Sequence, residues 1–146
     1  MNIQELAQRL IDEGCNPAAY AIGSRGTASD VVYLSCQQNE WQVCYTERGQ
    51  DSAPIFASAS ESQACEFFFQ HVMSLQHLHC IGFFKSQASE DALRATLSGL
   101  GIESRSDQIP YGGPGDPRYR VFVVGQAIFA AKEALGIELP LRDAGA

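Results

Sequence analysis

The sequence contains no apolar run of the length that a membrane-spanning helix requires. Such a helix needs about 20 consecutive, mainly apolar residues. Residues 1–5 also lack the basic start and the following apolar stretch of a signal peptide. We therefore expect a protein that has no membrane partner and stays in the cytoplasm.

Basic residues are few: 10 Lys and Arg stand against 17 Asp and Glu, for a formal net charge of −7. Nucleic-acid affinity comes largely from clustered Lys and Arg, so the composition argues against direct nucleic-acid binding. The excess of acid lies in residues 1–75, with a net charge of −6, whereas residues 76–146 have a net charge of −1. An acidic half either steers a basic partner or simply keeps the protein soluble.

Cysteine pairs with short spacing are missing. The chain has five cysteines, an odd number, and no CxxC motif. Together with the missing signal peptide, this favours reduced thiols and no disulfide. The cysteines are Cys15, Cys36, Cys44, Cys65 and Cys80.

What is present is the composition of a folded globular protein, with 45% hydrophobic and 18% charged residues in a length typical of one domain. The hydrophobic pattern predicts a single α+β domain over residues 1–146, with an antiparallel sheet packed on helices. Its element order is α-β-β-β-α in an acidic sub-half, residues 1–75, then β-α-(β)-β-α in residues 76–146.

The first sub-half is predicted to contain helices at residues 3–11 and 61–75, and strands at 31–36, 41–46 and 55–57. A turn centred near Asn39-Glu40 would place an almost wholly apolar set of side chains on one sheet face, which should pack on a helix. That set is Val32, Leu34, Cys36, Trp41, Val43 and Tyr45.

The second sub-half is predicted to begin with a strand at residues 80–84, followed by a helix that Ser89 caps and Gly99 ends. A weak strand at 102–106 precedes a loop at 109–117, which holds three prolines and three glycines in nine residues. A clear strand at 118–124 and a helix at 126–135 complete the chain.

No cluster of side chains meets the requirements of a metal or catalytic site. The cluster most like a metal site is His71, His77, His79 and Cys80, but His77-x-His79 straddles a predicted helix-to-strand junction. His71 lies near a helix end, where the dipole favours histidine anyway, so we expect neither metal nor cofactor. The sequence has no Gly-x-Ser-x-Gly nucleophile motif. Cys65 lies in an apolar helical stripe, where burial raises a thiol pKa. The chain is therefore not expected to be an enzyme.

Two further possibilities remain open from the residues alone. The loop at 109–120, with Arg118 and Arg120 on one face of a strand, could bind a small molecule or anion, although salt bridges would equally occupy these arginines. Alternatively, the three consecutive phenylalanines at 67–69 could form the seam of a homo-oligomeric scaffold.

The segment Tyr45-Thr46-Glu47-Arg48-Gly49, then Phe56, then residues 61–67 (ESQACEF) follows a strand that contains Trp41. With the opening helix, this pattern resembles small bacterial immunity proteins encoded beside polymorphic toxins, including contact-dependent and Rhs-type systems. The resemblance covers about the first 75 residues. It implies a non-catalytic cytoplasmic antitoxin that binds and neutralises a cognate toxin domain.

Because nuclease toxins are basic, the resemblance directs attention to acidic and aromatic residues near strand ends of the first sub-half. Trp41 and Tyr45 would be aromatic anchors, although both also fall on the predicted core face. Arg48 either contacts the partner or simply holds a turn before Gly49. The predicted partner-binding residues are Asp30, Glu40, Trp41, Tyr45, Glu47, Arg48 and Asp51.

Overall fold

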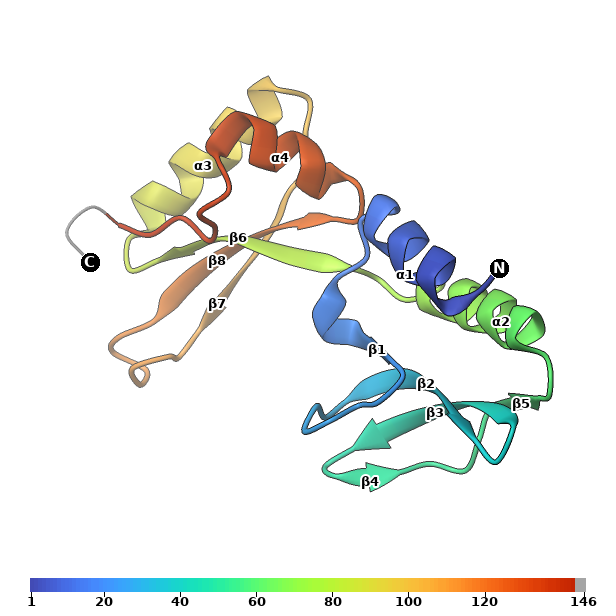
Figure 1. Cartoon of the computed structure of the whole chain (residues 1–146). Coiled ribbons are helices and arrows are strands. Elements are labelled where there is room, and N and C mark those ends of the chain that lie inside the picture. Colours follow the sequence, from blue (N-terminus) through green and yellow to red (C-terminus); the bar gives the residue numbers. More distant parts are fainter. Residues whose placement is uncertain (144–146) are drawn as a thin grey trace. The chain divides into compact units, whose positions relative to one another are not determined.

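The computed structural model describes residues 1–143, and the chain divides after His77 into two compact units, of which the second begins at Leu78 (Figure 1). Each unit has one sheet with two helices on one of its faces. The predicted α+β class is confirmed. Among the described residues, no helix is both long enough and apolar enough to cross a bilayer.

The first unit contains a sheet in the order β1-β2-β3-β4, with β5 paired to β3. Strands β1 and β2 run parallel, which differs from the antiparallel sheet predicted; residues 23–30 carry the chain back so that both strands run the same way. The elements are α1 (Ile3–Asp12), the 3-10 turn η1 (Pro17–Ala19), β1 (Tyr20–Ile22), β2 (Val31–Gln37), β3 (Glu40–Glu47), β4 (Gln50–Asp51), β5 (Phe56–Ser58) and α2 (Glu61–Met73).

The β2-β3 hairpin turns at Gln38 and Asn39, both with positive φ, one residue earlier than predicted. This moves every cross-strand partner by two residues. Since side chains alternate with period two, the residues that share a face are unchanged. The pairs on the predicted apolar face are Val32 with Tyr45, Leu34 with Val43, and Cys36 with Trp41.

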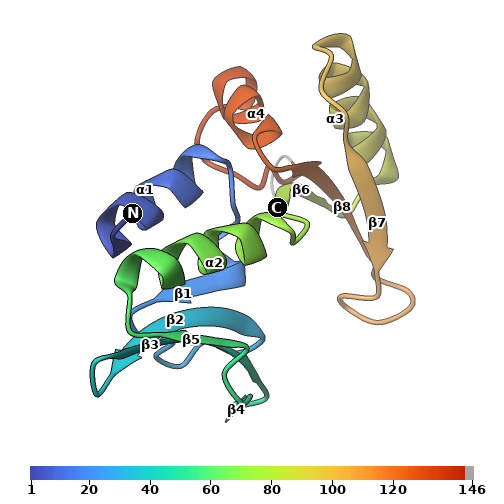
Figure 2. The same cartoon turned by 90° about the vertical axis from the view of Figure 1, so that its right-hand side faces the viewer.

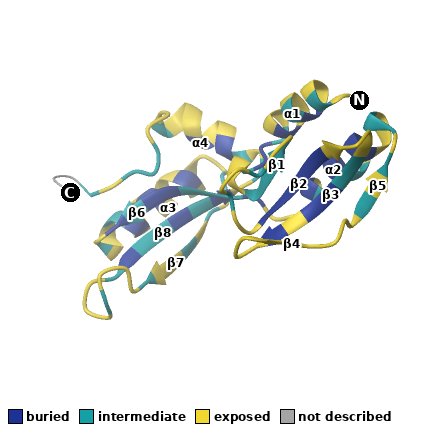
Figure 3. Ribbon diagram, turned by 60° about the horizontal axis from the view of Figure 1, so that its bottom comes forward, coloured by how far each residue is buried: buried dark blue, intermediate teal, exposed yellow. Residues whose placement is uncertain are grey.

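Helices α1 and α2 lie against this face of the sheet (Figure 2). Each begins at a capping side chain: Asn2 accepts a hydrogen bond from the Glu5 N–H at 2.9 Å, and Ser60 accepts one from the Gln63 N–H at 3.2 Å. The core between the two layers includes the fully buried side chains Leu6, Leu10, Leu34, Val43, Phe68 and Val72. Figure 3 shows such buried stretches in dark blue on β2, β3 and α2.

The second unit has three antiparallel strands in the order β6-β8-β7, with α3 and α4 on one face. Helix α3 begins three residues earlier than predicted, because Ser86 rather than Ser89 caps it. The weak strand predicted at 102–106 forms at 105–109. The elements are β6 (Leu78–Phe84), α3 (Gln87–Gly99), β7 (Arg105–Ile109), β8 (Arg118–Val124) and α4 (Ala127–Leu135).

The core of this unit lies between the helices and the inner sheet face, where Leu93 and Leu97 of α3 meet Val121 and Val123 of β8. Alternate residues of β8, among them Arg118, Arg120 and Phe122, point to the opposite face. That opposite face carries no helix of the described part of this unit.

Candidate functional site

The predicted partner-binding residues gather mainly at one end of the first sheet. Asp30 comes directly before β2 and Glu47 ends β3, and the pairing of Val31 with Thr46 makes these two residues neighbours across the strands. Tyr45 lies on the same face of β3 as Glu47, because side chains two residues apart share a face. Asp30 and Glu47 are exposed, and 39% of Tyr45 is exposed.

The exposure of Tyr45 corrects the prediction that its ring belongs to the core. Tyr45 stands on the face that the helices cover further along β3, where Val43 is fully buried. Partial burial raises the pKa of Tyr45, and the negative charges of Asp30 and Glu47 raise it further. The phenol is therefore neutral near pH 7 and available as a hydrogen-bond donor.

Arg48 begins the two-residue turn between β3 and β4, where Arg48 and Gly49 have φ values of 51° and 76°. The turn interpretation of Arg48 is thus confirmed, while its side chain remains exposed. Its backbone N–H donates to Ser29 Oγ at 3.0 Å, which links the hairpin to the loop before β2. The same residue therefore both shapes the turn and presents a cation.

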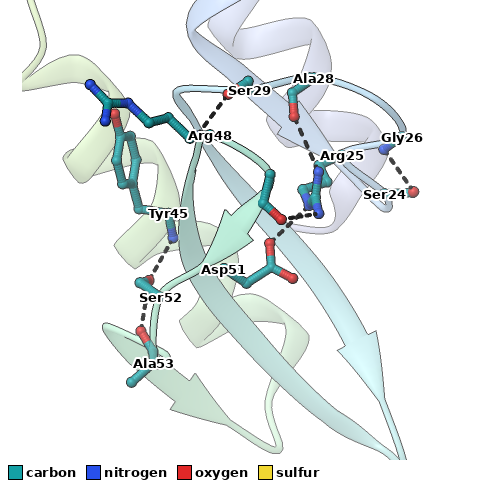
Figure 4. A network of polar contacts seen from close by, with 11 residues as sticks. Ser24, Arg25, Gly26, Ala28, Ser29, Tyr45, Arg48, Asp51, Ser52 and Ala53 are labelled. Carbon is teal, nitrogen blue, oxygen red and sulfur yellow. Dashed lines mark hydrogen bonds and ion pairs between the residues drawn. The ribbon is translucent and has the colours of Figure 1, made fainter.

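Asp51 belongs to the opposite side of the hairpin, paired with Thr46 in the ladder. Its Oδ1 accepts from Arg25 Nε at 2.8 Å, and the same guanidinium donates to the carbonyls of Ala28 and Gly49 at 3.3 and 3.4 Å. Figure 4 shows Asp51 turned toward Arg25, while Tyr45 and Arg48 extend to the other side. Asp51 is therefore committed to holding the loops together.

Ser52 completes the frame around Tyr45. The Tyr45 N–H donates to Ser52 Oγ at 3.0 Å, and the Ser52 N–H donates to the Tyr45 carbonyl at 2.7 Å. The Ser52 hydroxyl in turn donates to the carbonyl of Ala53 at 2.8 Å. These bonds fix the backbone from which the Tyr45 side chain projects (Figure 4).

We call the exposed set Asp30, Tyr45, Glu47 and Arg48 the Tyr45 surface. The sequence analysis did not single out Arg25, Ser29 and Ser52, which hold its loops in place. One signal in the sequence pointed to Arg25: it is one of only three basic residues in the acidic first 75. The serines carry no comparable signal, because serine is common in all loops.

Glu40 and Trp41 lie at the other end of β3, beside the Gln38-Asn39 turn. At about 3.3 Å per residue, Glu40 and Glu47 are separated by roughly 23 Å along the strand. Trp41 is half-buried and packs against the core of the first unit, and the Glu40 carboxylate accepts a hydrogen bond from Gln42 at 2.9 Å. The structure therefore does not bring these two residues together with the Tyr45 surface.

Two residues considered for metal or nucleophile chemistry, His77 and Cys65, have structural roles. His77 Nδ1 accepts from the Asn16 N–H at 3.0 Å, and its Nε2 lies 2.8 Å from the Val72 carbonyl, so both ring nitrogens are occupied. Cys65 is fully buried, and burial raises its pKa to about 11. A thiol with that pKa is protonated near pH 7 and is a poor nucleophile.

The residues of the two alternative functions, anion binding by the 109–120 loop and a homo-oligomer seam at residues 67–69, already have contacts within the chain. Arg120 binds Asp107 through two nitrogens, and Arg118 Nη1 binds Asp116 Oδ1 at 2.8 Å, so both arginines already have carboxylate partners. In the phenylalanine run, Phe68 and Phe69 are buried, and Phe67 stacks on Phe56 with centroids 4.4 Å apart. These rings pack within the first unit.

The chain matches no family model, no curated protein and no solved structure. What the chain binds is therefore argued from its own side chains.

Thr46, behind the Tyr45 surface, has a fully buried hydroxyl with no hydrogen-bond partner among residues 1–143. A buried polar group without a partner destabilises the folded state. Thr46→Val should therefore raise the free energy of unfolding by about 1 kcal/mol, measured by urea denaturation. Thr46→Ser keeps the hydroxyl and should give no gain; equal stabilisation by both variants would contradict the argument.

Tyr33 is buried on the same sheet face as Thr46, and we expect its ionisation to lower the stability of the fold at alkaline pH. Burial raises its pKa to about 12, and the nearby Cys44 and Asp51 add to the effect. Since the unfolded state loses the phenol proton first, stability should be unaffected below pH 10 and decline between pH 10 and 12. Urea denaturation of Tyr33→Phe should show a shallower decline over that window; identical slopes would contradict this assignment.

Proposed function

We propose that the chain is a non-catalytic, cytoplasmic inhibitor of a bacterial toxin domain, and that it binds the toxin through the Tyr45 surface. The observation that carries the proposal is an exposed tyrosine near two carboxylates, Asp30 and Glu47, with an arginine at the adjacent turn. Neither carboxylate has an ion-pair partner among residues 1–143. The sequence resemblance to immunity proteins includes Tyr45, Glu47 and Arg48.

The chemistry of the Tyr45 surface suits recognition of a basic protein. Tyrosine and arginine supply much of the binding energy at protein interfaces, since they bury a large area and still form hydrogen bonds. Asp30 and Glu47 would pair with cations on the partner and exclude partners of the wrong charge. A toxin that cleaves nucleic acid must be basic to hold phosphates, so it is the partner class that fits best.

The rigidity of the Tyr45 surface also supports the proposal. Hydrogen bonds at Ser29 and Ser52 and the Arg25–Asp51 ion pair fix both loops before a partner arrives. A preordered surface loses less conformational entropy on binding than a flexible one. In addition, the net charge of −6 on residues 1–75 would accelerate encounter with a basic partner, most strongly at low salt.

The test begins with the tagged chain as bait in its native host, with mass spectrometry of proteins retained after a moderate-salt wash. The recovered partner is then expressed in a laboratory bacterial strain with and without the chain. We expect a stoichiometric basic partner that stops growth when expressed alone and loses this effect when the chain is present. A partner that is harmless alone, or whose toxicity the chain does not change, would refute the inhibitor function.

The salt dependence of toxin binding shows whether the acidic residues 1–75 steer the partner electrostatically or only keep the protein soluble. If the acidic half guides binding, the association rate should fall as ionic strength rises while the dissociation rate changes little. Surface plasmon resonance at several salt concentrations measures both rates. A salt-independent association rate would mean that the acidic half serves only to keep the protein soluble.

A further inference from the structure

The second unit contains a cavity of about 200 Å³ at the end of its helix-free sheet face. This volume is smaller than a typical drug-sized pocket and suits a fragment about one ring in size. Its lining combines two aromatic rings with three cations and one carboxylate: Phe83, Tyr111, Lys85, Arg118, Arg142 and Asp143.

The aromatic wall of the cavity is well ordered by ring and cation contacts. Phe83 and Tyr111 meet edge to face, with centroids 5.2 Å apart and planes at 85°. Arg142 lies over the Phe83 ring at 4.8 Å, and Arg118 lies over the Tyr111 ring at 4.8 Å. The Tyr111 side chain is nevertheless 64% exposed, which leaves room for a further ring against it.

The cationic part of the cavity has donor capacity that the protein does not use. Arg118 is about nine-tenths buried, and its hydrogen bonds to Asp116 and Pro117 all come from Nη1, so Nε and Nη2 have no acceptor among residues 1–143. Within the same residues, neither Lys85 nor Arg142 has a carboxylate within ion-pair distance.

The side chains that line the cavity have a positive net charge, although the whole chain has a formal net charge of −7. Three cations and one carboxylate, Asp143, line the cavity. Asp143 Oδ2 accepts from the backbone N–H of Lys85 at 2.6 Å, and its Oδ1 is buried with no hydrogen-bond partner among residues 1–143. Even when Asp116 is counted as the partner of Arg118, one positive charge remains. One negative charge on a ligand therefore balances the cavity, whereas a phosphate dianion would leave it with a net negative charge.

We propose that this cavity binds a small aromatic carboxylate, with the ring against Tyr111 and Phe83 and the carboxylate among Lys85, Arg118 and Arg142. Arginine is suited to this role because its planar fork binds a carboxylate through two hydrogen bonds. The same chemistry occurs in a free aromatic acid and in a polypeptide that ends in an aromatic residue. The site is independent of the Tyr45 surface and of the proposed inhibitor function.

The full chain is titrated with benzoate by isothermal calorimetry and by NMR chemical-shift changes. We expect binding with a Kd of about 1 mM or tighter, as suits a ligand with so few atoms. Benzamide, which keeps the ring without the charge, and inorganic phosphate, which has charge without a ring, should each bind at least about five-fold more weakly. Absence of benzoate binding, or equal binding of benzamide, would overturn the proposal.

The two sources of the carboxylate are separated with a short neutral peptide that ends in phenylalanine and its C-terminally amidated form. Tighter binding of the free-acid peptide than of benzoate identifies a chain terminus as the ligand, whereas weaker binding identifies a free acid. Both results support the site, whether the free-acid peptide binds more tightly or more weakly than benzoate. If the free-acid peptide binds, its amidated form should not. Equal binding of the amidated and free-acid peptides would overturn it.

Matched variants assign the binding to this cavity. Arg142→Gln and Lys85→Gln should each weaken benzoate binding by about five-fold or more, since each removes a cation without removing much volume. Lys132→Gln on α4, away from the cavity lining, is the control and should leave the affinity unchanged. An equal loss in the control, or no loss in the two cavity variants, would place any benzoate binding elsewhere.

Discussion

Glu47→Lys is expected to weaken binding to the cognate toxin domain by about 2 kcal/mol, or roughly 30-fold in Kd. The substitution replaces an exposed carboxylate beside Asp30 and Tyr45 with a cation, so a basic partner meets repulsion where it met attraction. Titration calorimetry with the purified toxin domain measures the change. Urea denaturation should show unchanged stability, because the Glu47 side chain makes no ion pair in the described residues.

Glu40→Lys is the matched control for this experiment. It makes the same change of charge on the same strand, at the end that the structure separates from the Tyr45 surface. We expect less than about a three-fold effect on affinity, as for a charge at the rim or outside an interface. A larger loss from Glu40→Lys than from Glu47→Lys would move the proposed interface to the Gln38-Asn39 turn.

Tyr45→Ala distinguishes a binding role for the ring from a packing role. If Tyr45 anchors the partner, affinity should fall by about 2 kcal/mol while the free energy of unfolding changes by less than about 1 kcal/mol. The half-exposed position supports this expectation. A large loss of stability with no separate loss of affinity would assign the ring to the core of the first unit.

Leu10→Ala should destabilise the first unit by about 3 kcal/mol. Leu10 is fully buried between α1 and the sheet, so truncation removes apolar contacts and leaves a cavity. Trp41 is the only tryptophan and packs against the same core, which makes its fluorescence a direct probe of unfolding in urea. The expected result is a lower midpoint with an unchanged dependence on urea concentration.

Ile11→Ala is the control for Leu10→Ala, because the two residues are neighbours on the same helix. The Ile11 side chain is 55% exposed, so its truncation should cost less than about 1 kcal/mol, with part of the loss offset by the higher helix propensity of alanine. Equal effects of the two variants would contradict the burial of Leu10 and the packing of α1 on the sheet.

The pattern of apolar residues was sufficient to predict most elements and the α+β class. Helical spacing located α1 and α2, and the β-branched runs located β2, β3 and β8. The face shared by Val32, Leu34 and Val43 was predicted correctly despite a turn placed one residue late, because alternation fixes the face independently of that shift. The parallel pairing of β1 was missed, since a three-residue strand carries no signal for its partner's direction.

The candidate site was only partly predictable, because proximity across a sheet depends on register. Glu40 and Glu47 are both acids of one strand and look equivalent in the sequence, yet the strand separates them by its full length. Asp30 and Glu47 are far apart in sequence and become neighbours through the Val31–Thr46 pair. Asp51 looked like one more surface acid until its ion pair with Arg25 assigned it to the loops.

The sequence by itself determined the charge of each half, the identity and order of most elements and the absence of catalytic motifs, because these depend on local pattern and composition. Only the tertiary structure decided that Tyr45 is exposed where Val43 is buried, and that Phe67–Phe69 pack inside one unit. It also decided that Tyr111 and Arg118, from the Gly/Pro-rich loop and its end, line a cavity with Phe83 and Arg142. The physical reason is that exposure and ion pairing are set by neighbours distant in sequence, which no local pattern specifies.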